Sequence, residues 1–166
     1  LHDALPIFVS NEDRMNCSVH LSADETAVEL LDQTQLPNRQ VYLDLTTAEE
    51  IYNAIKVLAV RGAPAIGICA GYAMYVLARA RAGMDPAAFA ASMHEDGEYL
   101  ISSRPTAVNL SWAVKRMLAL IDEKAEELAG AADAVDQIIA LLHDEAIAIH
   151  DEDIQMCYRI AEYGLS

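Results

Sequence analysis

Hydrophobic and polar residues follow two different periods along the chain. Residues 41–45, VYLDL, alternate apolar and polar side chains, which is typical of a half-buried strand. The segment AVELLDQ at 27–33 precedes it, and Leu36-Pro37-Asn38 supplies turn residues between the two. Residues 19–21 form a weaker third candidate. The pattern predicts a small antiparallel sheet of two or three strands.

After residue 46 the period changes to that of a helix. Thr47 and Glu50 are spaced as in a capping box, in which each side chain binds a free N–H group of the first turn. Ile51, Ala54, Ile55 and Leu58 follow at helical spacing. We expect this helix to stop near Arg61-Gly62.

Prolines mark the starts of three further helices, because proline is tolerated in the first helical turn. The first of these predicted helices begins at Ala63-Pro64 and ends near Arg81. The second begins at Asp85-Pro86 and reaches Leu100, and the third begins after Arg104, at Pro105. A long amphipathic pattern then follows Gly130 and continues to about Tyr163, with Gly164 as its stop. The chain is therefore expected to be α+β, with a small antiparallel sheet followed by a helical bundle and a long helix.

Composition and charge narrow the class of protein. The 166 residues are 54% hydrophobic but only 6% aromatic, which favours closely packed helices. A net charge of −15 repels a nucleic-acid backbone, and the longest apolar run ends at Arg79, short of the roughly 18 residues that span a bilayer. Neither nucleic acid nor membrane is an expected partner.

Three cysteines without a CxxC pair fit a reducing cytoplasm better than a disulfide framework or a zinc site. We interpret Cys157 as a thiol packed within a helix. His143 and His150, each followed by acidic residues, are seven residues apart, about 10 Å along a helix, which is too far to share one metal ion. No metal site is expected there, and a solvated helix face is the favoured interpretation. Trp112, Tyr52, Tyr72 and Tyr75 are expected in the core or at an interface.

The segment RGAPAIG, residues 61–67, has the properties of an anion cradle. Gly62 lets the backbone approach a ligand, the N–H groups that begin the next helix face outward, and Arg61 adds a charged donor. The same residues are also consistent with an ordinary corner between two helices, in which small side chains serve only packing. Arg104 repeats the arrangement before Pro105, so a shared phosphate site and a plain surface arginine both remain open.

Four segments together carry a family resemblance. They are ELLDQ at 29–33, VYLDLTT at 41–47, RGAPAIG at 61–67 and SRPTAVNLSWAVKRM at 103–117. They resemble the S-methyl-5-thioribose-1-phosphate isomerases of methionine salvage, whose superfamily includes the α, β and δ regulatory subunits of eIF2B. The resemblance extends from about residue 27 to residue 166.

The resemblance implies an N-terminal domain at 8–130, a linker helix at 131–166 and a Rossmann-like domain beyond it. It implies a cytoplasmic homodimer that isomerises a sugar phosphate without a cofactor. By position, Arg61, Gly62, Ala63 and Arg104 match substrate-binding residues of the family. The family's catalytic cysteine and aspartate motifs do not occur in residues 1–166, so these groups are expected beyond Ser166.

Residues 1–7, LHDALPI, lack the features of a signal peptide and match the translation of a common sequencing adapter, so we expect a non-native leader. Three alternatives to the isomerase remain open: a non-catalytic regulatory subunit related to eIF2B, a ribose-1,5-bisphosphate isomerase, and a plain helical interaction module. The last of these gives no role to the two proline-flanked arginines.

Overall fold

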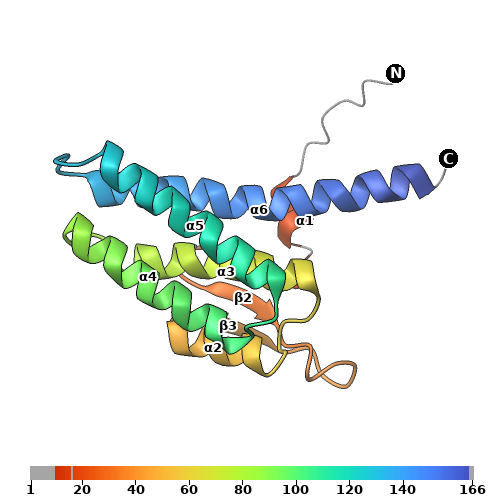
Figure 1. Cartoon of the computed structure of the whole chain (residues 1–166). Helices are drawn as coiled ribbons and strands as arrows, with labels where there is room; N and C mark the ends of the chain where they lie inside the picture. The colour runs from red at the N-terminus through yellow and green to blue at the C-terminus, as the bar shows by residue number, and fades with distance from the viewer. Residues whose placement is uncertain (1–9, 16, 165–166) are drawn as a thin grey trace.

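The computed structural model describes residues 10–15 and 17–164, except for the side chains of residues 11 and 13. A small sheet lies against one side of a bundle of helices (Figure 1). The predicted leader at 1–7 lies outside the described residues. A short helix that the sequence did not predict, α1 (Asn11–Met15), precedes the sheet.

The sheet is antiparallel and has the predicted strands. Within the described residues its order is β1 (Val19–Leu21), β2 (Val28–Leu31) and β3 (Tyr42–Leu45). Val19 pairs with Leu30, and Leu30 pairs with Leu43, so the apolar positions share one face. The weaker strand prediction at 19–21 is thereby confirmed.

The helix α2 (Ala48–Lys56) starts as predicted and ends earlier than predicted. Glu50 N–H donates to Thr47 Oγ1 at 3.3 Å, and Thr47 N–H donates to Glu50 Oε2 at 3.0 Å, which is the capping box. The predicted end near Arg61 is wrong, because Leu58 takes φ 62° and ends the helix. Ala59 N–H then donates to Ala54 C=O at 2.9 Å, a Schellman closure with leucine in the position that usually holds glycine.

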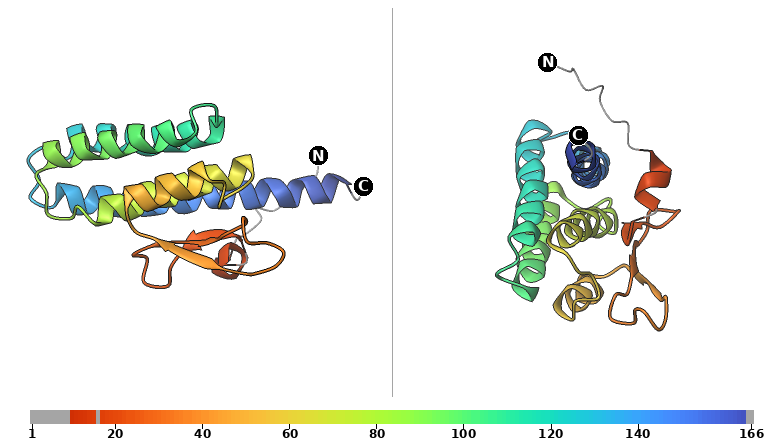
Figure 2. Two further views of the ribbon diagram at one scale, coloured as in Figure 1. Left: turned by 90° about the horizontal axis from the view of Figure 1, so that it is seen from below. Right: turned by 90° about the vertical axis from the view of Figure 1, so that its right-hand side faces the viewer.

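The helix α3 (Ala63–Arg79) is the centre of the fold. Every residue from Ile66 to Ala78 is buried, since the sheet covers one side of α3 and other helices cover the rest (Figure 2). The neighbours α4 (Pro86–Ser103) and α5 (Val108–Glu127) pack against α3 and against each other. Asp85 caps α4 as predicted, with Oδ1 accepting from Ala87 N–H at 3.0 Å and from Ala88 N–H at 3.2 Å.

The last helix, α6 (Ala134–Gly164), runs along the whole bundle and extends past the other helices (Figures 1 and 2). Its first part supplies core residues, including Val135, Ile138, Leu142, Ala146 and Ile149. Residues 156–164 are all exposed. Among the described residues, no helix has the length and apolar character needed to span a membrane.

Several predicted environments of single residues differ from those observed. Tyr72 and Tyr75 are buried as predicted, whereas Trp112 is 47% exposed, so of its two predicted environments, core or interface, the core is wrong. Cys157 is exposed, so its interpretation as a packed thiol is wrong: it falls on the part of α6 that extends past the bundle. His150 is fully buried, which overturns its assignment to a solvated helix face.

Candidate functional site

The backbone at Gly62 places the start of α3 in a conformation that only glycine adopts readily. Gly62 is the N-cap residue, with φ 96° and ψ 134°. A Cβ at this position would meet only the Cβ of Ala65, at 3.9 Å, so the requirement is conformational and not steric. The preceding residues Ala59 and Val60 are buried, and Gln33 N–H donates to Ala59 C=O at 2.9 Å, which joins this corner to the segment that follows β2.

The first turn of α3 has no partner of its own within the described residues. No side chain caps it and no acidic residue lies in it. Ile66 N–H donates to Gly62 C=O at 3.0 Å, which is the first bond from a residue to the fourth before it in this helix. The N–H groups before Ile66 and the positive end of the helix dipole therefore favour an anion at Gly62-Ala63.

Arg104 lies at a second corner, between α4 and α5. Its backbone is extended, with φ −148° and ψ 82°, as predicted for a residue before proline. The prediction that Pro105 opens the next helix is wrong. Ala107 N–H donates to Arg104 C=O at 3.0 Å and closes a turn over Pro105-Thr106, so α5 begins only at Val108. Ala107, its N-cap residue, has no side chain that can cap the helix.

The two helix starts converge on one cavity. The first turn of α5 packs closely on α3 because residue 67 is glycine: a Cβ there would lie 3.3 Å from Asn109 C=O. A cavity of about 460 Å³ lies between the two starts. It is lined by Gly62, Ala63, Ile66, Arg104, Thr106, Ala107, Val108 and Asn109. We call this cavity the cradle.

Of the four residues predicted from the sequence, the structure brings Gly62, Ala63 and Arg104 together in the cradle. Arg61 is exposed and is not among the lining residues. Sequence reasoning assigned no role to Thr106 or Asn109, although both lie in the quoted RPTAVNL segment. Their place in the cradle depends on the packing of α5 against Gly67, which spacing along the chain does not reveal.

The guanidinium groups of the two predicted arginines, Arg61 and Arg104, are not neutralised by an acidic partner in the described part of the chain. In the part of the chain that the structure describes, no hydrogen bond or ion pair joins either guanidinium to another residue. Arg14, Arg81 and Arg116, in contrast, are paired with Asp151, Asp96 and Glu152. An uncompensated arginine beside two uncapped helix starts is suited to bind a phosphate group.

A second cavity continues from the cradle along α3. It has a volume of about 480 Å³ and is lined by Pro64, Gly67, Ile68, Val108, Asn109, Trp112, Ile149, Glu152, Asp153 and Met156. We call it the apolar groove. It shares Val108 and Asn109 with the cradle. Burial raises the pKa of Asp153 at its edge.

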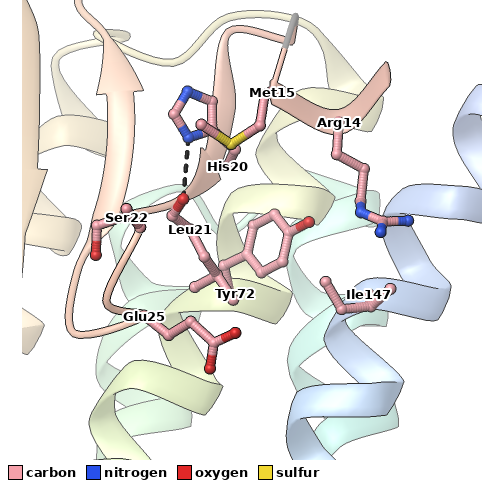
Figure 3. A pocket seen from close by; sticks show the side chains of 9 residues that line it. Arg14, Met15, His20, Leu21, Ser22, Glu25, Tyr72 and Ile147 are labelled. Atoms are coloured by element: carbon pink, nitrogen blue, oxygen red, sulfur yellow. Dashed lines mark hydrogen bonds between the residues drawn. The ribbon is translucent and has the colours of Figure 1, made fainter. Parts of the chain in front are cut away.

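A third cavity, of about 230 Å³, opens between α1, the sheet and α6 (Figure 3). The two charged residues that line it, Arg14 and Glu25, already have partners. Arg14 bonds to Asp151 at 2.6 Å, and Glu25 accepts from Tyr75 Oη at 3.1 Å and lies 3.3 Å from His143 Nε2. His20 Nδ1 lies 3.1 Å from Leu21 C=O. This internal pairing leaves the cradle as the better candidate for an anionic ligand.

The two histidines of α6 have separate environments. His150 Nδ1 lies 2.7 Å from Tyr72 Oη in the core, and burial lowers the pKa of His150 to about 4. His143 lies near the surface beside Glu25 and Asp144. Among the described residues, no three His, Cys, Asp or Glu side chains are grouped closely enough to hold a metal ion.

Known proteins resemble this chain in sequence and in fold. It is 45% identical over 139 residues to a 5-deoxyribose 1-phosphate isomerase of Moorella thermoacetica, and 44% identical over 133 residues to one of Clostridium botulinum strain Loch Maree. These alignments cover 84% and 80% of the chain. The chain spans only 38% and 36% of the length of those two relatives.

Two solved structures share the fold. The 5-methylthioribose 1-phosphate isomerase of Pyrococcus horikoshii matches with a TM-score of 0.73 and 34% identity, over 81% of this chain and 36% of that one. The delta subunit of translation initiation factor eIF-2B from A. fulgidus matches with a TM-score of 0.70 and 32% identity, over 82% of this chain and 37% of that one. Residues 59–166, well over half of the chain, also match the model of one protein family, and the chain is therefore a member of the initiation factor 2 subunit family.

Proposed function

We propose that this chain is the phosphate-binding part of an aldose–ketose isomerase that acts on a pentose 1-phosphate. The relatives named above include isomerases of 5-deoxyribose 1-phosphate and of 5-methylthioribose 1-phosphate. Both sugars carry a phosphate on the anomeric oxygen and lack a 5-hydroxyl group. Our proposed substrate is a pentose 1-phosphate of this kind, with 5-methylthioribose 1-phosphate as the first candidate.

One observation supports the proposal. Gly62 and Ala63 lie far from Arg104 in the sequence, yet all three line one cavity between two helix starts that no side chain caps. The reaction needs such a site. A phosphate on the anomeric oxygen prevents simple opening to an aldehyde, so the enzyme must hold the phosphate while the ring opens. Hydrogen then moves from C2 to C1 as the ketose forms.

In this scheme the cradle positions the sugar and stabilises charge, and other groups move the hydrogen. Arg104 and the N–H groups of the first turns of α3 and α5 would bind the phosphate oxygens, with Arg61 closing over them from the rim. We place the catalytic cysteine and aspartate beyond Ser166. The complete protein would act as a cytoplasmic homodimer and would need no cofactor.

The test is to replace Arg104 in the complete protein and to follow turnover of 5-methylthioribose 1-phosphate and 5-deoxyribose 1-phosphate. Arg104→Gln removes a charge-assisted donor, and we expect kcat/KM to fall about 100-fold. Arg39→Gln is the matched control, because Arg39 is an exposed arginine in the loop between β2 and β3. We expect the control to change kcat/KM less than twofold. Equal losses in the two variants would contradict the proposal.

The likeness to the delta subunit of eIF-2B favours a second candidate, a non-catalytic regulatory subunit. A subunit of that kind works by binding partner proteins. Turnover of either sugar phosphate by the complete protein would exclude this candidate. The absence of turnover, together with binding of the complete protein to a translation factor, would support it over the isomerase.

A further inference from the structure

The helix α6 leaves the bundle at a definite point. Ile154, which is 9% exposed, is its last buried residue, and every described residue from Met156 onward is exposed. Residues 155–164 therefore continue for about 15 Å past the last buried residue. Figures 1 and 2 show this end of α6 beyond the other helices. The contacts that hold α6 just before Ile154 therefore set the direction of the extension.

Two arginines hold α6 at this point, one from each side. Arg14 of α1 bonds to Asp151 at 2.6 Å. Arg116 of α5 donates two hydrogen bonds of 2.8 Å to the Glu152 carboxylate and one hydrogen bond to Glu145. The right-hand view of Figure 2 shows α1 and α5 on either side of α6. We call these two arginines and three acids the ionic collar.

The Arg116 side of the collar fixes an angle as well as a distance. A planar guanidinium that binds both oxygens of the Glu152 carboxylate allows little rotation between the two helices. The guanidinium also lies 5.3 Å from the centre of the Trp112 ring, which restricts it from a second direction. Hydrogen bonds from Arg116 lower the pKa of Glu152, so the pair stays charged. Arg116 lies two helical turns, about 10 Å, after Asn109 of the cradle, so α5 connects the cradle directly to the collar.

From these observations we infer that Arg116 is a positioning residue for the isomerase reaction, an inference that rests on the proposed function. Through Glu152 it sets the direction of α6 relative to the cradle, and so the place of the catalytic groups that the proposed function puts beyond Ser166. Helix α6 extends about 18 Å from Glu152 to Gly164, so a tilt of about 5° at the collar moves its end by about 1.5 Å. A displacement of about 1 Å between reacting groups can lower a rate by about 100-fold. Arg116 does not line the cradle, so phosphate binding should not depend on it.

The experiment measures kcat and KM for 5-methylthioribose 1-phosphate in the complete protein, together with the inhibition constant of inorganic phosphate. The variants are Arg116→Gln and Glu152→Gln. We expect kcat to fall about tenfold or more in both, while KM and the inhibition constant change less than twofold, because the cradle keeps its donors.

Arg81→Gln is the matched control. The Arg81 side chain is 23% exposed and pairs with Asp96 at 2.5 Å, whereas the Arg116 side chain is 24% exposed. Arg81 follows the end of α3 that lies away from the cradle. This control should lose stability by a similar amount and change kcat less than twofold.

Different negative results overturn different statements. An unchanged kcat in both collar variants, or an equal fall of kcat in Arg81→Gln, overturns the positioning role while the isomerase proposal stands. A rise of KM and of the inhibition constant together would make Arg116 part of phosphate binding and would overturn the inference as well. Should Arg116→Gln fail to fold, Glu152→Gln decides alone, because it changes a side chain that is 53% exposed. If the wild-type protein turns over neither 5-methylthioribose 1-phosphate nor 5-deoxyribose 1-phosphate, the proposed function fails and the inference fails with it.

Discussion

The backbone conformation near the cradle depends on single residues. The sequence indicated Gly62 as a point where the backbone can approach a ligand, but it did not predict the positive φ that makes glycine necessary there. The left-handed Leu58 was not readable, since leucine rarely takes positive φ and the apolar spacing continues through it. Its conformation depends on the burial of Ala59 and Val60, which is a tertiary effect.

The conformation of Gly62 leads to a prediction for the variant Gly62→Ala. With φ 96° and ψ 134°, an alanine has the space it needs but not a favourable backbone conformation. We expect the free energy of unfolding to fall by about 1–3 kcal/mol, measured by urea denaturation. Gly164→Ala is the control, because Gly164 ends a helix in open space and should change stability by less than about 0.5 kcal/mol. A Gly62→Ala variant as stable as the control would show that this strain is relieved by a shift of the corner.

The buried His150 predicts a pH dependence of stability. Burial lowers the pKa of His150 to about 4 from an ordinary value of 6.5, so the unfolded chain binds a proton between these values and the native chain does not. Stability from this group is complete above pH 6.5 and declines as the pH falls toward 4. Between pH 7 and pH 5 the loss should be about 2 kcal/mol.

This pH effect can be isolated by comparing variants in urea denaturation near pH 7 and near pH 5. His150→Gln keeps a polar partner for Tyr72 but does not titrate, so its stability should fall less than that of the wild-type chain. His94→Gln replaces an exposed histidine paired with Asp122 and should retain the wild-type dependence. The same pH dependence in all three proteins would rule out His150 as its source.

At the scale of elements, the starts of helices were predicted better than their ends. A start is specified by local chemistry, such as the capping box at Thr47 or Asp85 before Pro86. The exception is α5, because the turn at 105–106 uses Pro105 before the helix begins. The convergence of α3 and α5 on the cradle was only a hypothesis from the sequence, because it depends on the contact of Gly67 with Asn109 across two helices.

The capping box of α2 supplies a prediction at this scale. Thr47→Ala removes the oxygen that accepts from Glu50 N–H and leaves this donor without its side-chain partner. We expect a loss of about 1 kcal/mol in the free energy of unfolding, measured by urea denaturation. Thr47→Ser retains the hydroxyl and should stay within about 0.5 kcal/mol of the wild-type chain. If the serine variant loses as much as the alanine variant, the methyl group of Thr47 and not its hydroxyl is what stabilises the helix.

At the scale of the whole molecule, the overall charge and the local site oppose each other. A net charge of −15 repels a sugar phosphate at long range, so binding must rely on the few donors of the cradle. The chain also spans little more than a third of its relatives, and the end of α6 exposes Met156, Ile160 and Tyr163. On the proposed function, the apolar end of α6 would be covered in the complete protein, where the catalytic groups would also lie.

Binding and catalysis should therefore separate when residues 1–166 are compared with the complete protein. Because the cradle is built entirely from residues 62–109, the chain alone should bind 5-methylthioribose 1-phosphate, with chemical-shift changes at Gly62 and Asn109 that Arg104→Gln abolishes. It should show no turnover, since we place the groups that move hydrogen beyond Ser166. The complete protein should show both binding and turnover. Turnover by residues 1–166 alone would mean that the reacting groups lie within this chain, and the division of labour proposed above would then be wrong.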